Sequence, residues 1–152
     1  MESLEKTIKL FSEATHVVVG GDSAGGLAAF TWTNYIADRV KVGKVWSLPD
    51  SGVFLDTVNV RTKTQTYREG FINLMKLSNV EIDSPVTECN KDFPDNKVNC
   101  FFAQNLHKYI KVPLFAIQSL YDTWSVYNIL GISCISGSSL AKCTDVERKV
   151  IE

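Results

Sequence analysis

The stretch His16-Val17-Val18-Val19-Gly20-Gly21-Asp22-Ser23-Ala24-Gly25-Gly26 decides the fold of this chain. Its β-branched run predicts a short buried strand that ends at the glycines, and the segment from Ala24 to about Arg39 predicts a helix. A strand that turns into a helix at a G-x-S-x-G motif is typical of a nucleophile elbow. Ser23 is therefore the candidate nucleophile, and the backbone N–H of Ala24 is a candidate oxyanion donor.

The glycines on both sides of Ser23 suit a sharp, strained turn in which strand and helix approach too closely for side chains. The helix N-terminus also places the serine at the positive end of the helix dipole. A glycine-rich phosphate loop and a plain turn are the alternatives. The motif is not G-x-G-x-x-G, and no P-loop lysine follows it, so the pattern favours the nucleophile.

Strands and helices alternate along the rest of the chain, which predicts the α/β class with a parallel sheet and flanking helices. Active sites in such sheets lie beyond the carboxyl ends of the strands. A helix is expected over 3–14, before the strand that leads to Ser23, and a strand over 44–48 is followed by a loop at 49–52. Another helix is marked by Tyr67, Phe71, Leu74 and Leu77. A third buried strand is expected over 113–118, and a last helix over 136–150 with Ser136 or Ser138 near its N-cap.

The length of 152 residues indicates one domain or part of one. With 45% hydrophobic and 22% charged residues, the composition is that of an ordinary globular chain. Lys and Arg number 16 against 17 Asp and Glu, a balance that argues against a nucleic-acid partner. No apolar run approaches the roughly 18 residues of a membrane span, and the first residues lack the apolar core of a signal peptide. The charged run from Arg61 to Glu69 is interpreted as a solvated face.

A triad in an α/β-hydrolase runs Ser, then Asp or Glu, then His along the chain. Asp122 directly follows the strand expected over 113–118 and is the candidate acid, with Asp50 and Asp56 as competitors. The two histidines, His16 and His107, both precede Asp122. His16 lies at the start of a strand and His107 in a short surface helix, so we interpret both as structural or solvent-facing. The base is therefore missing from the pattern.

Four cysteines form two local pairs by spacing, because ten residues separate Cys89 from Cys100 and eight separate Cys134 from Cys143. Neither spacing is that of a zinc knuckle, and both histidines lie elsewhere, so we expect no metal site. Two small disulfide loops, each contributing about 2–3 kcal/mol, fit the even count. Four buried free thiols are the alternative that the residues alone leave open.

Four blocks of the chain resemble the pectin acetylesterase and Notum family of carboxylesterases. Residues 21–28 (GDSAGGLA) resemble the family elbow G-x-S-A-G-G, and residues 48–56 (LPDSGVFLD) resemble its D-[AS]-G-x-F-L-D segment. Residues 99–106 (NCFFAQNL) are similar to its C-F-F-P-Q-N block, and residues 119–124 (SLYDTW) to its S-x-Y-D-x-W block. The blocks occur in the family order, which makes the resemblance more specific than a lone G-x-S-x-G.

The resemblance implies an α/β-hydrolase fold that is incomplete at both ends, with residues 1–152 as one partial domain. It implies ester hydrolysis through an acyl-enzyme on Ser23, with Asp122 as the orienting acid, and acetylated pectin or another acyl ester as substrate. No cofactor is expected, and Asp50 is a candidate for substrate contact. The family is secreted, so the resemblance also favours Cys89–Cys100 and Cys134–Cys143 as disulfides.

Some positions depart from the family pattern. Asp22 stands where relatives carry Cys or Ser, Ala103 replaces a proline, and Ser125 replaces a common glutamine. No histidine follows Asp122, so we expect at most trace esterase activity from the isolated 152-residue chain. One rival interpretation is an inactive family member that acts as a polysaccharide-binding or protein-binding remnant. Another is a serine esterase or acyltransferase of a different α/β-hydrolase family, against which the D-S-G-x-F-L-D and C-F-F blocks argue.

Overall fold

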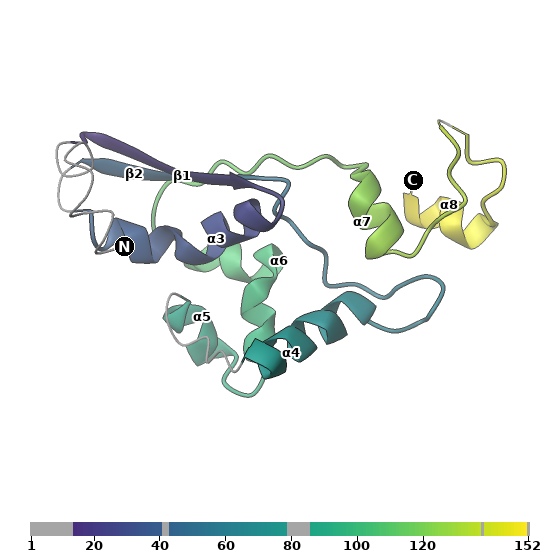
Figure 1. Cartoon of the computed structure of the whole chain (residues 1–152), viewed down its shortest axis with the longest axis horizontal. Helices are drawn as coiled ribbons and strands as arrows, with labels where there is room; N and C mark the ends of the chain where they lie inside the picture. The colour runs from purple at the N-terminus through teal and green to yellow at the C-terminus, as the bar shows by residue number, and fades with distance from the viewer. Residues whose placement is uncertain (1–13, 41–42, 79–85, 138, 152) are drawn as a thin grey trace. The chain divides into compact units, whose positions relative to one another are not determined.

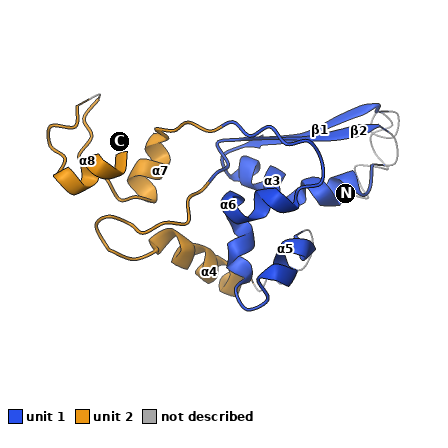
Figure 2. Ribbon diagram, turned by 180° about the vertical axis from the view of Figure 1, so that it is seen from behind, with its two compact units in different colours: residues 1–53, 82–117 blue, residues 54–81, 118–152 orange. Residues whose placement is uncertain are grey.

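The computed structural model (Figure 1) describes residues 14–40, 43–78, 86–137 and 139–151. The chain divides into two compact units, which are coloured in Figure 2. Unit 1 contains residues 1–53 and 82–117, and unit 2 contains residues 54–81 and 118–152. The helix expected over residues 3–14 lies outside the described residues.

The centre of unit 1 is a β-α-β arrangement of β1 (His16–Asp22), α3 (Ala24–Ala37) and β2 (Lys44–Asp50). The two strands are parallel, with a register that runs from His16 beside Lys44 to Asp22 beside Asp50. The predicted strand and helix around Ser23 are thus confirmed. β2 extends two residues beyond the predicted 44–48, because Pro49 and Asp50 still pair with the end of β1.

The third expected strand is present only as an extended segment along β2. Isolated parallel bridges join Ser47 to Leu114 and Asp50 to Ile117. The Ile117 N–H donates to the Pro49 carbonyl (2.9 Å), but Pro49 has no N–H to donate in return. The ladder therefore lacks one hydrogen bond in its middle, and a regular strand over 113–118 is not formed.

Helix α3 covers one face of the sheet. Its buried residues Gly26, Ala29, Phe30 and Thr33 recur with the spacing of a single helix face. The Thr33 hydroxyl lies 2.9 Å from the Ser47 hydroxyl, and both side chains are almost fully buried. This buried hydrogen bond ties the helix to β2 and satisfies the Ser47 hydroxyl, while the Thr33 hydroxyl also donates to the Ala29 carbonyl (2.5 Å).

The other face of the sheet carries exposed apolar side chains. Val18 is 59% exposed, Phe115 is 70% exposed, and Ile117 is 44% exposed. The sequence predicted a buried third strand, and in this respect the prediction is wrong for Phe115 and Ile117. The reason is that no described residue of unit 1 covers this face, whereas parallel sheets are generally covered on both faces.

The rest of unit 1 consists of short helices, which Figure 1 shows below the sheet and α3. The disulfide Cys89–Cys100 joins two of them at buried positions, and Phe102 and Leu106 are buried beside it. The Asn34 side chain ties this part to α3, because its amide donates to the Tyr109 carbonyl and accepts from the Lys111 N–H. The helices are α5 (Thr87–Asp92), η1 (Lys97–Phe101), α6 (Ala103–Leu106) and η2 (His107–Tyr109).

Unit 2 contains the helices α4 (Thr66–Ser78), α7 (Thr123–Asn128) and α8 (Asp145–Ile151). α4 confirms the helix predicted around Tyr67. The helix predicted over 136–150 is shorter than expected, because residues 134–143 form a loop closed by the disulfide Cys134–Cys143. Within the described ranges, no helix is long and apolar enough to cross a bilayer.

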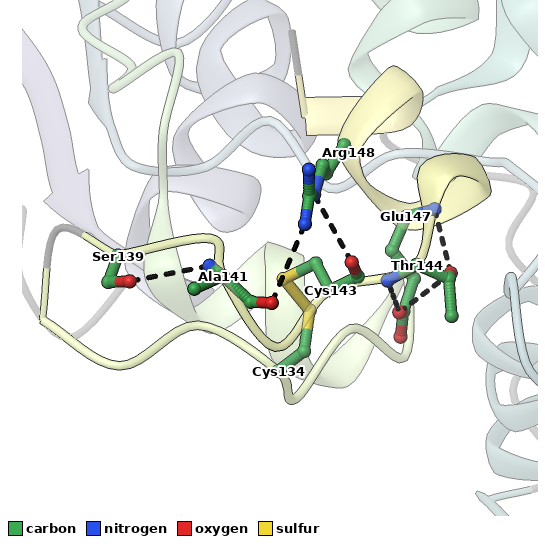
Figure 3. The surroundings of a disulfide bond; sticks show 7 residues. All are labelled: Cys134, Ser139, Ala141, Cys143, Thr144, Glu147 and Arg148. Atoms are coloured by element: carbon green, nitrogen blue, oxygen red, sulfur yellow. Dashed lines mark hydrogen bonds between the residues drawn. A yellow bond between two sulfur atoms is a disulfide. The ribbon is translucent and has the colours of Figure 1, made fainter.

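Figure 3 shows how the disulfide loop leads into α8. Thr144 and Glu147 form a capping box, in which the Glu147 N–H donates to the Thr144 hydroxyl and the Thr144 N–H donates to the Glu147 carboxylate. The Thr144 N–H and, after it, the Thr144 hydroxyl, which also donates to the Glu147 carboxylate (2.8 Å), lower the pKa of Glu147. The Arg148 guanidinium donates to the Cys143 carbonyl. The helix therefore begins after Thr144 and not near Ser136, and the T-x-x-E pattern is the signal that marks this start.

The loop after residue 54 is held by two buried polar side chains. Asp56 accepts from the Arg68 Nε at 3.0 Å, and both side chains are mostly buried, so Arg68 does not belong to a solvated face. The Asn59 side chain accepts from the Arg61 and Thr62 N–H groups and donates to the Ile129 carbonyl. These contacts connect the loop to α4 and to the end of α7.

We predict that Asn59→Ala lowers the free energy of unfolding by about 1–3 kcal/mol, because buried backbone groups at both ends of its hydrogen bonds lose their partner. Asn73→Ala is the matched control, since Asn73 is exposed on α4 and alanine favours the helix. Urea denaturation of both variants measures the difference. Equal stability of the two variants would contradict this role of Asn59.

Candidate active site

Ser23 lies on a sharp turn between β1 and α3. Its φ and ψ are 56° and −118°, a left-handed conformation that is unusual for a residue with a side chain. The Ser23 N–H donates to the Asp50 carbonyl (3.0 Å), and the Ser23 carbonyl accepts from the Leu27 N–H (3.0 Å). Backbone hydrogen bonds to the end of β2 and into α3 thus hold the strained residue. This is the geometry of a nucleophile elbow.

Ser23 occupies the N-cap of α3, but its hydroxyl makes no capping hydrogen bond. Serine at an N-cap usually accepts from the helix backbone, so this exposed hydroxyl remains available for another partner. Ala24 is the first residue of the helix, and its N–H has no acceptor four residues earlier within the helix. Among the described residues, neither the Ser23 hydroxyl nor the adjacent Ala24 N–H is used by the first turn of α3, and both lie at the positive end of the helix dipole.

A contact between two glycines holds the elbow against the loop after β2. A Cβ on Gly26 would lie 2.3 Å from the Asp50 carbonyl oxygen, and a Cβ on Gly52 would lie 2.4 Å from the Gly26 carbonyl carbon. A Cβ on Gly21 would lie 2.5 Å from the Gly25 carbonyl oxygen, whereas a Cβ on Gly25 would contact nothing within 4 Å. The close approach expected at the glycines therefore requires glycine at positions 21 and 26, whereas a Cβ at position 25 would cause no clash.

Asp50 lies beside the elbow at the carboxyl end of β2. Its carbonyl accepts from Ser23, and its carboxylate accepts from the Ser51 hydroxyl (2.9 Å). Ser51 has a positive φ of 50°, and its N–H donates to the Ile117 carbonyl. The structure thus brings Ser23, Ala24 and Asp50 together in unit 1.

Asp122 belongs to unit 2, where it is the N-cap of α7. Its Oδ1 accepts from the Trp124 N–H (3.3 Å), and its Oδ2 accepts from both the N–H (3.1 Å) and the hydroxyl (2.5 Å) of Ser125. Ser125 was not among the residues predicted to belong to the site. The D-x-x-S pattern could have identified it, because a capping aspartate commonly meets the side chain three residues later.

The two histidines occupy structural positions, as interpreted from the sequence. His16 stacks on Trp46 with ring centroids 5.2 Å apart, at the opposite end of β1 from Ser23, about 20 Å away at the rise of a strand. The Nδ1 of His107 lies 2.8 Å from the Ala103 carbonyl oxygen in a local contact. The competing acid Asp56 is engaged by Arg68. In the described part of the chain, no cluster of His, Cys, Asp and Glu could hold a metal ion.

An aromatic cluster in unit 2 includes the tryptophan of the 119–124 block. The Trp124 ring packs edge-on against Phe54 (5.5 Å between centroids) and Tyr67 (5.8 Å), and Tyr67 packs on Phe71 (5.1 Å). Phe54 is buried, whereas Trp124 is 46% exposed. Burial raises the pKa of Tyr67 to about 12. The cluster fixes the ring that follows Asp122 by two residues.

Comparison of this sequence with known proteins finds a matching family model and similar relatives. The family model described as Pectinacetylesterase matches residues 1–151. Pectin acetylesterase 5 of Arabidopsis thaliana is 31% identical over 134 residues, which are 87% of this chain and 30% of that protein. Pectin acetylesterase 11 of Arabidopsis thaliana is 24% identical over 153 residues, which are 95% of this chain and 38% of that protein. The chain thus spans about a third of the length of these relatives.

Two solved structures share the fold. They are crystal forms I and II of the Wnt deacylase Notum from Drosophila, with TM-scores of 0.72 and 0.74. Their sequence identities to this chain are 22% and 21%, and they cover 90% and 92% of it, against 38% and 39% of Notum itself. The expected parallel sheet with flanking helices, as a part of an α/β-hydrolase fold, is confirmed.

The contact between Gly26 and Gly52 predicts opposite effects for two neighbouring substitutions. Gly26→Ala forces a Cβ into backbone atoms and should lower the free energy of unfolding by about 1–3 kcal/mol. Gly25→Ala, one residue earlier in the same helix turn, meets open space and should be neutral or up to about 1 kcal/mol stabilising. Thermal unfolding of both variants and of the wild type measures these differences in stability. A stable Gly26→Ala variant would show that the backbones do not touch.

The half-buried Tyr67 predicts a specific loss of stability in alkali. Its folded pKa of about 12 exceeds the ordinary value of 10.0, so its contribution is complete below pH 10 and is lost as the pH rises toward 12. Tyr67→Phe should match the wild type at pH 7 and lose less stability between pH 7 and pH 11 in urea denaturation. Tyr127→Phe, at an exposed position, should behave as the wild type at both pH values. An unchanged pH dependence in Tyr67→Phe would contradict this burial.

Proposed function

This chain belongs to the pectinacetylesterase family, and from that premise we propose that the protein is a serine carboxylesterase that removes acetyl groups from a polysaccharide such as pectin. The observation that carries the proposal is the strained Ser23, whose hydroxyl is not used to cap α3. A serine held by its backbone alone keeps its Oγ free to react. Ordinary N-cap serines use this oxygen for the helix.

In the proposed reaction, a histidine takes the Ser23 hydroxyl proton while Oγ attacks the acetyl carbonyl carbon. The oxyanion accepts a hydrogen bond from the Ala24 N–H, which the helix leaves without a partner. The histidine then gives the proton to the leaving sugar oxygen as the ester bond breaks. Water, deprotonated by the same histidine, then attacks the acetyl carbonyl carbon; the bond to Ser23 Oγ breaks, the histidine returns the proton to Oγ, and acetate leaves.

Asp122 is the proposed acid that fixes the tautomer of this histidine and stabilises its charged form. In the chain order of α/β-hydrolases the base follows the acid. Residues 123–152 contain no histidine, so the chain 1–152 does not supply a base in that order. The isolated chain 1–152 should accordingly show at most trace turnover.

Asp50 is proposed to contact the substrate, because it follows β2 directly beside the elbow and its carboxylate lies at the carboxyl end of the sheet. An acetylated sugar chain offers hydroxyl groups that a carboxylate can accept from. Other acyl esters remain candidate substrates, since Notum is described as a Wnt deacylase.

The two disulfides are the pairs that the sequence predicted, and disulfides persist in oxidising compartments. We therefore propose a secreted protein, in line with the pectin acetylesterase names of its relatives. We also propose that residues 1–152 belong to one partial α/β-hydrolase domain, which is supported by a single family model that matches residues 1–151.

The second candidate function is a catalytically inactive protein that binds a polysaccharide. The observation that favours it is the position of both histidines, because His16 lies at the far end of β1 and precedes Asp122. Such a protein would retain the elbow as a structural turn only.

Acetate release from acetylated pectin by the complete natural protein containing residues 1–152 distinguishes the two functions. The wild type should hydrolyse the ester, and Ser23→Ala should lose about 10⁴-fold or more in kcat, as removal of a triad member does. Ser78→Ala, at an exposed serine of α4, is the matched control and should retain full activity. Wild-type protein that binds pectin without releasing acetate supports the inactive form, and activity that survives Ser23→Ala refutes the proposed nucleophile.

A further inference from the structure

The carboxylate of Asp122 is held unevenly by the first turn of α7. Oδ2 accepts two hydrogen bonds from one residue, the N–H of Ser125 at 3.1 Å and the hydroxyl of Ser125 at 2.5 Å. Oδ1 accepts a single long one, from the Trp124 N–H at 3.3 Å. Because a carboxylate oxygen offers about two lone-pair sites, Oδ2 is saturated and Oδ1 retains acceptor capacity.

Helix capping alone does not require the Ser125 hydroxyl. A capping aspartate satisfies the free N–H groups at N2 and N3, and here these are the N–H groups of Trp124 and Ser125. The hydroxyl is a third donor on a residue that is only 6% exposed. A hydrogen bond from a hydroxyl to a charged carboxylate in such a place is among the stronger kinds, and it directs the plane of the carboxylate.

We propose that Ser125 is a positioning residue of the esterase, which holds Oδ2 of Asp122 so that Oδ1 receives the Nδ1–H of the catalytic histidine. This inference rests on the proposed function, and it adds the residue that orients the acid and the oxygen that the acid uses. It concerns a position at which this chain has serine instead of the family's common glutamine.

The Ser125 hydroxyl adds a constraint on the rotation of the Asp122 carboxylate. With the hydroxyl present, both donors to Oδ2 come from a single buried residue, so rotation of the carboxylate breaks two hydrogen bonds at once. Without the hydroxyl, only the two backbone hydrogen bonds of 3.1 and 3.3 Å remain. A carboxylate that rotates more freely orients the histidine less well, which slows proton transfer without changing how substrate binds.

The test is steady-state kinetics of the complete natural protein on 4-nitrophenyl acetate, with three variants at this helix. Ser125→Ala should lower kcat about 10-fold to 100-fold and leave KM within about twofold, the effect expected of one hydrogen bond to a charged group. Ser125→Thr keeps a hydroxyl and should restore kcat to within about threefold of the wild type. Asn128→Ala removes the side-chain hydrogen bond to the Trp124 carbonyl and so weakens α7 without touching Asp122, and it should keep full kcat.

Each other outcome is decisive. Wild-type protein without turnover overturns the proposed function and the role of Ser125 with it. Wild-type turnover that Ser23→Ala abolishes and Ser125→Ala leaves unchanged overturns the inference alone. Equal losses in Ser125→Ala, Ser125→Thr and Asn128→Ala would also overturn it, because they would show that only the stability of α7 matters. Tryptophan fluorescence at the assay temperature verifies that every variant compared is folded.

Discussion

At the carboxyl end of β1, the first turn of α3 rests on the loop after β2 with no side chain between the two backbones. A Cβ on Gly26 would lie 2.3 Å from the Asp50 carbonyl oxygen, so the contact is possible only with glycine. This approach brings the same carbonyl within 3.0 Å of the Ser23 N–H and fixes the left-handed turn at the serine. The free hydroxyl of Ser23 is thus a consequence of how closely two backbones pack.

The two halves of the proposed chemistry depend on different kinds of support. Ser23 is held by the end of a parallel sheet, where register places Asp22 beside Asp50. Asp122 is held by a helix of six residues through its own side chain, which accepts from Trp124 and Ser125. The sheet supports a strained backbone, whereas the short helix supports the orientation of a carboxylate. Substitutions in the two places should therefore affect different steps: one the nucleophile, the other the acid that orients its base.

Local patterns made the centre of unit 1 predictable from the sequence. The β-branched run before Gly20 and the G-x-S-x-G motif agree with the observed β1, the turn at Ser23 and α3. The features that were predicted wrongly, such as the end of β2 and the surroundings of Arg68, depend on contacts that local sequence patterns do not encode. Pro49 continues β2 because it pairs with Gly21, yet its missing N–H interrupts the next ladder. Arg68 was expected in solvent and instead pairs with Asp56, twelve residues away.

Other differences had a signal in the sequence that a closer look at capping would have found. The capping box of Thr144 and Glu147 begins α8 well after the predicted start. The disulfide Cys134–Cys143 closes a loop just before it, which leaves the helix to begin after Thr144. Ser125 stands three residues after Asp122, the spacing at which a side chain meets an N-cap. The steric requirements at Gly25 and Gly26 could not have been distinguished by pattern, since only the position of the loop after β2 decides at which of the two a Cβ would clash.

The reactivity of Ser23 is measured most directly by covalent labelling of the complete natural protein with a fluorophosphonate, which reacts only with an activated serine. Peptide mapping then identifies the labelled residue. We expect a single phosphonylated residue, Ser23, on the tryptic peptide of residues 10–39, and no label after the protein is unfolded in urea. Labelling at another serine, or no labelling of folded protein that releases acetate, would contradict the claim that this elbow supplies the nucleophile.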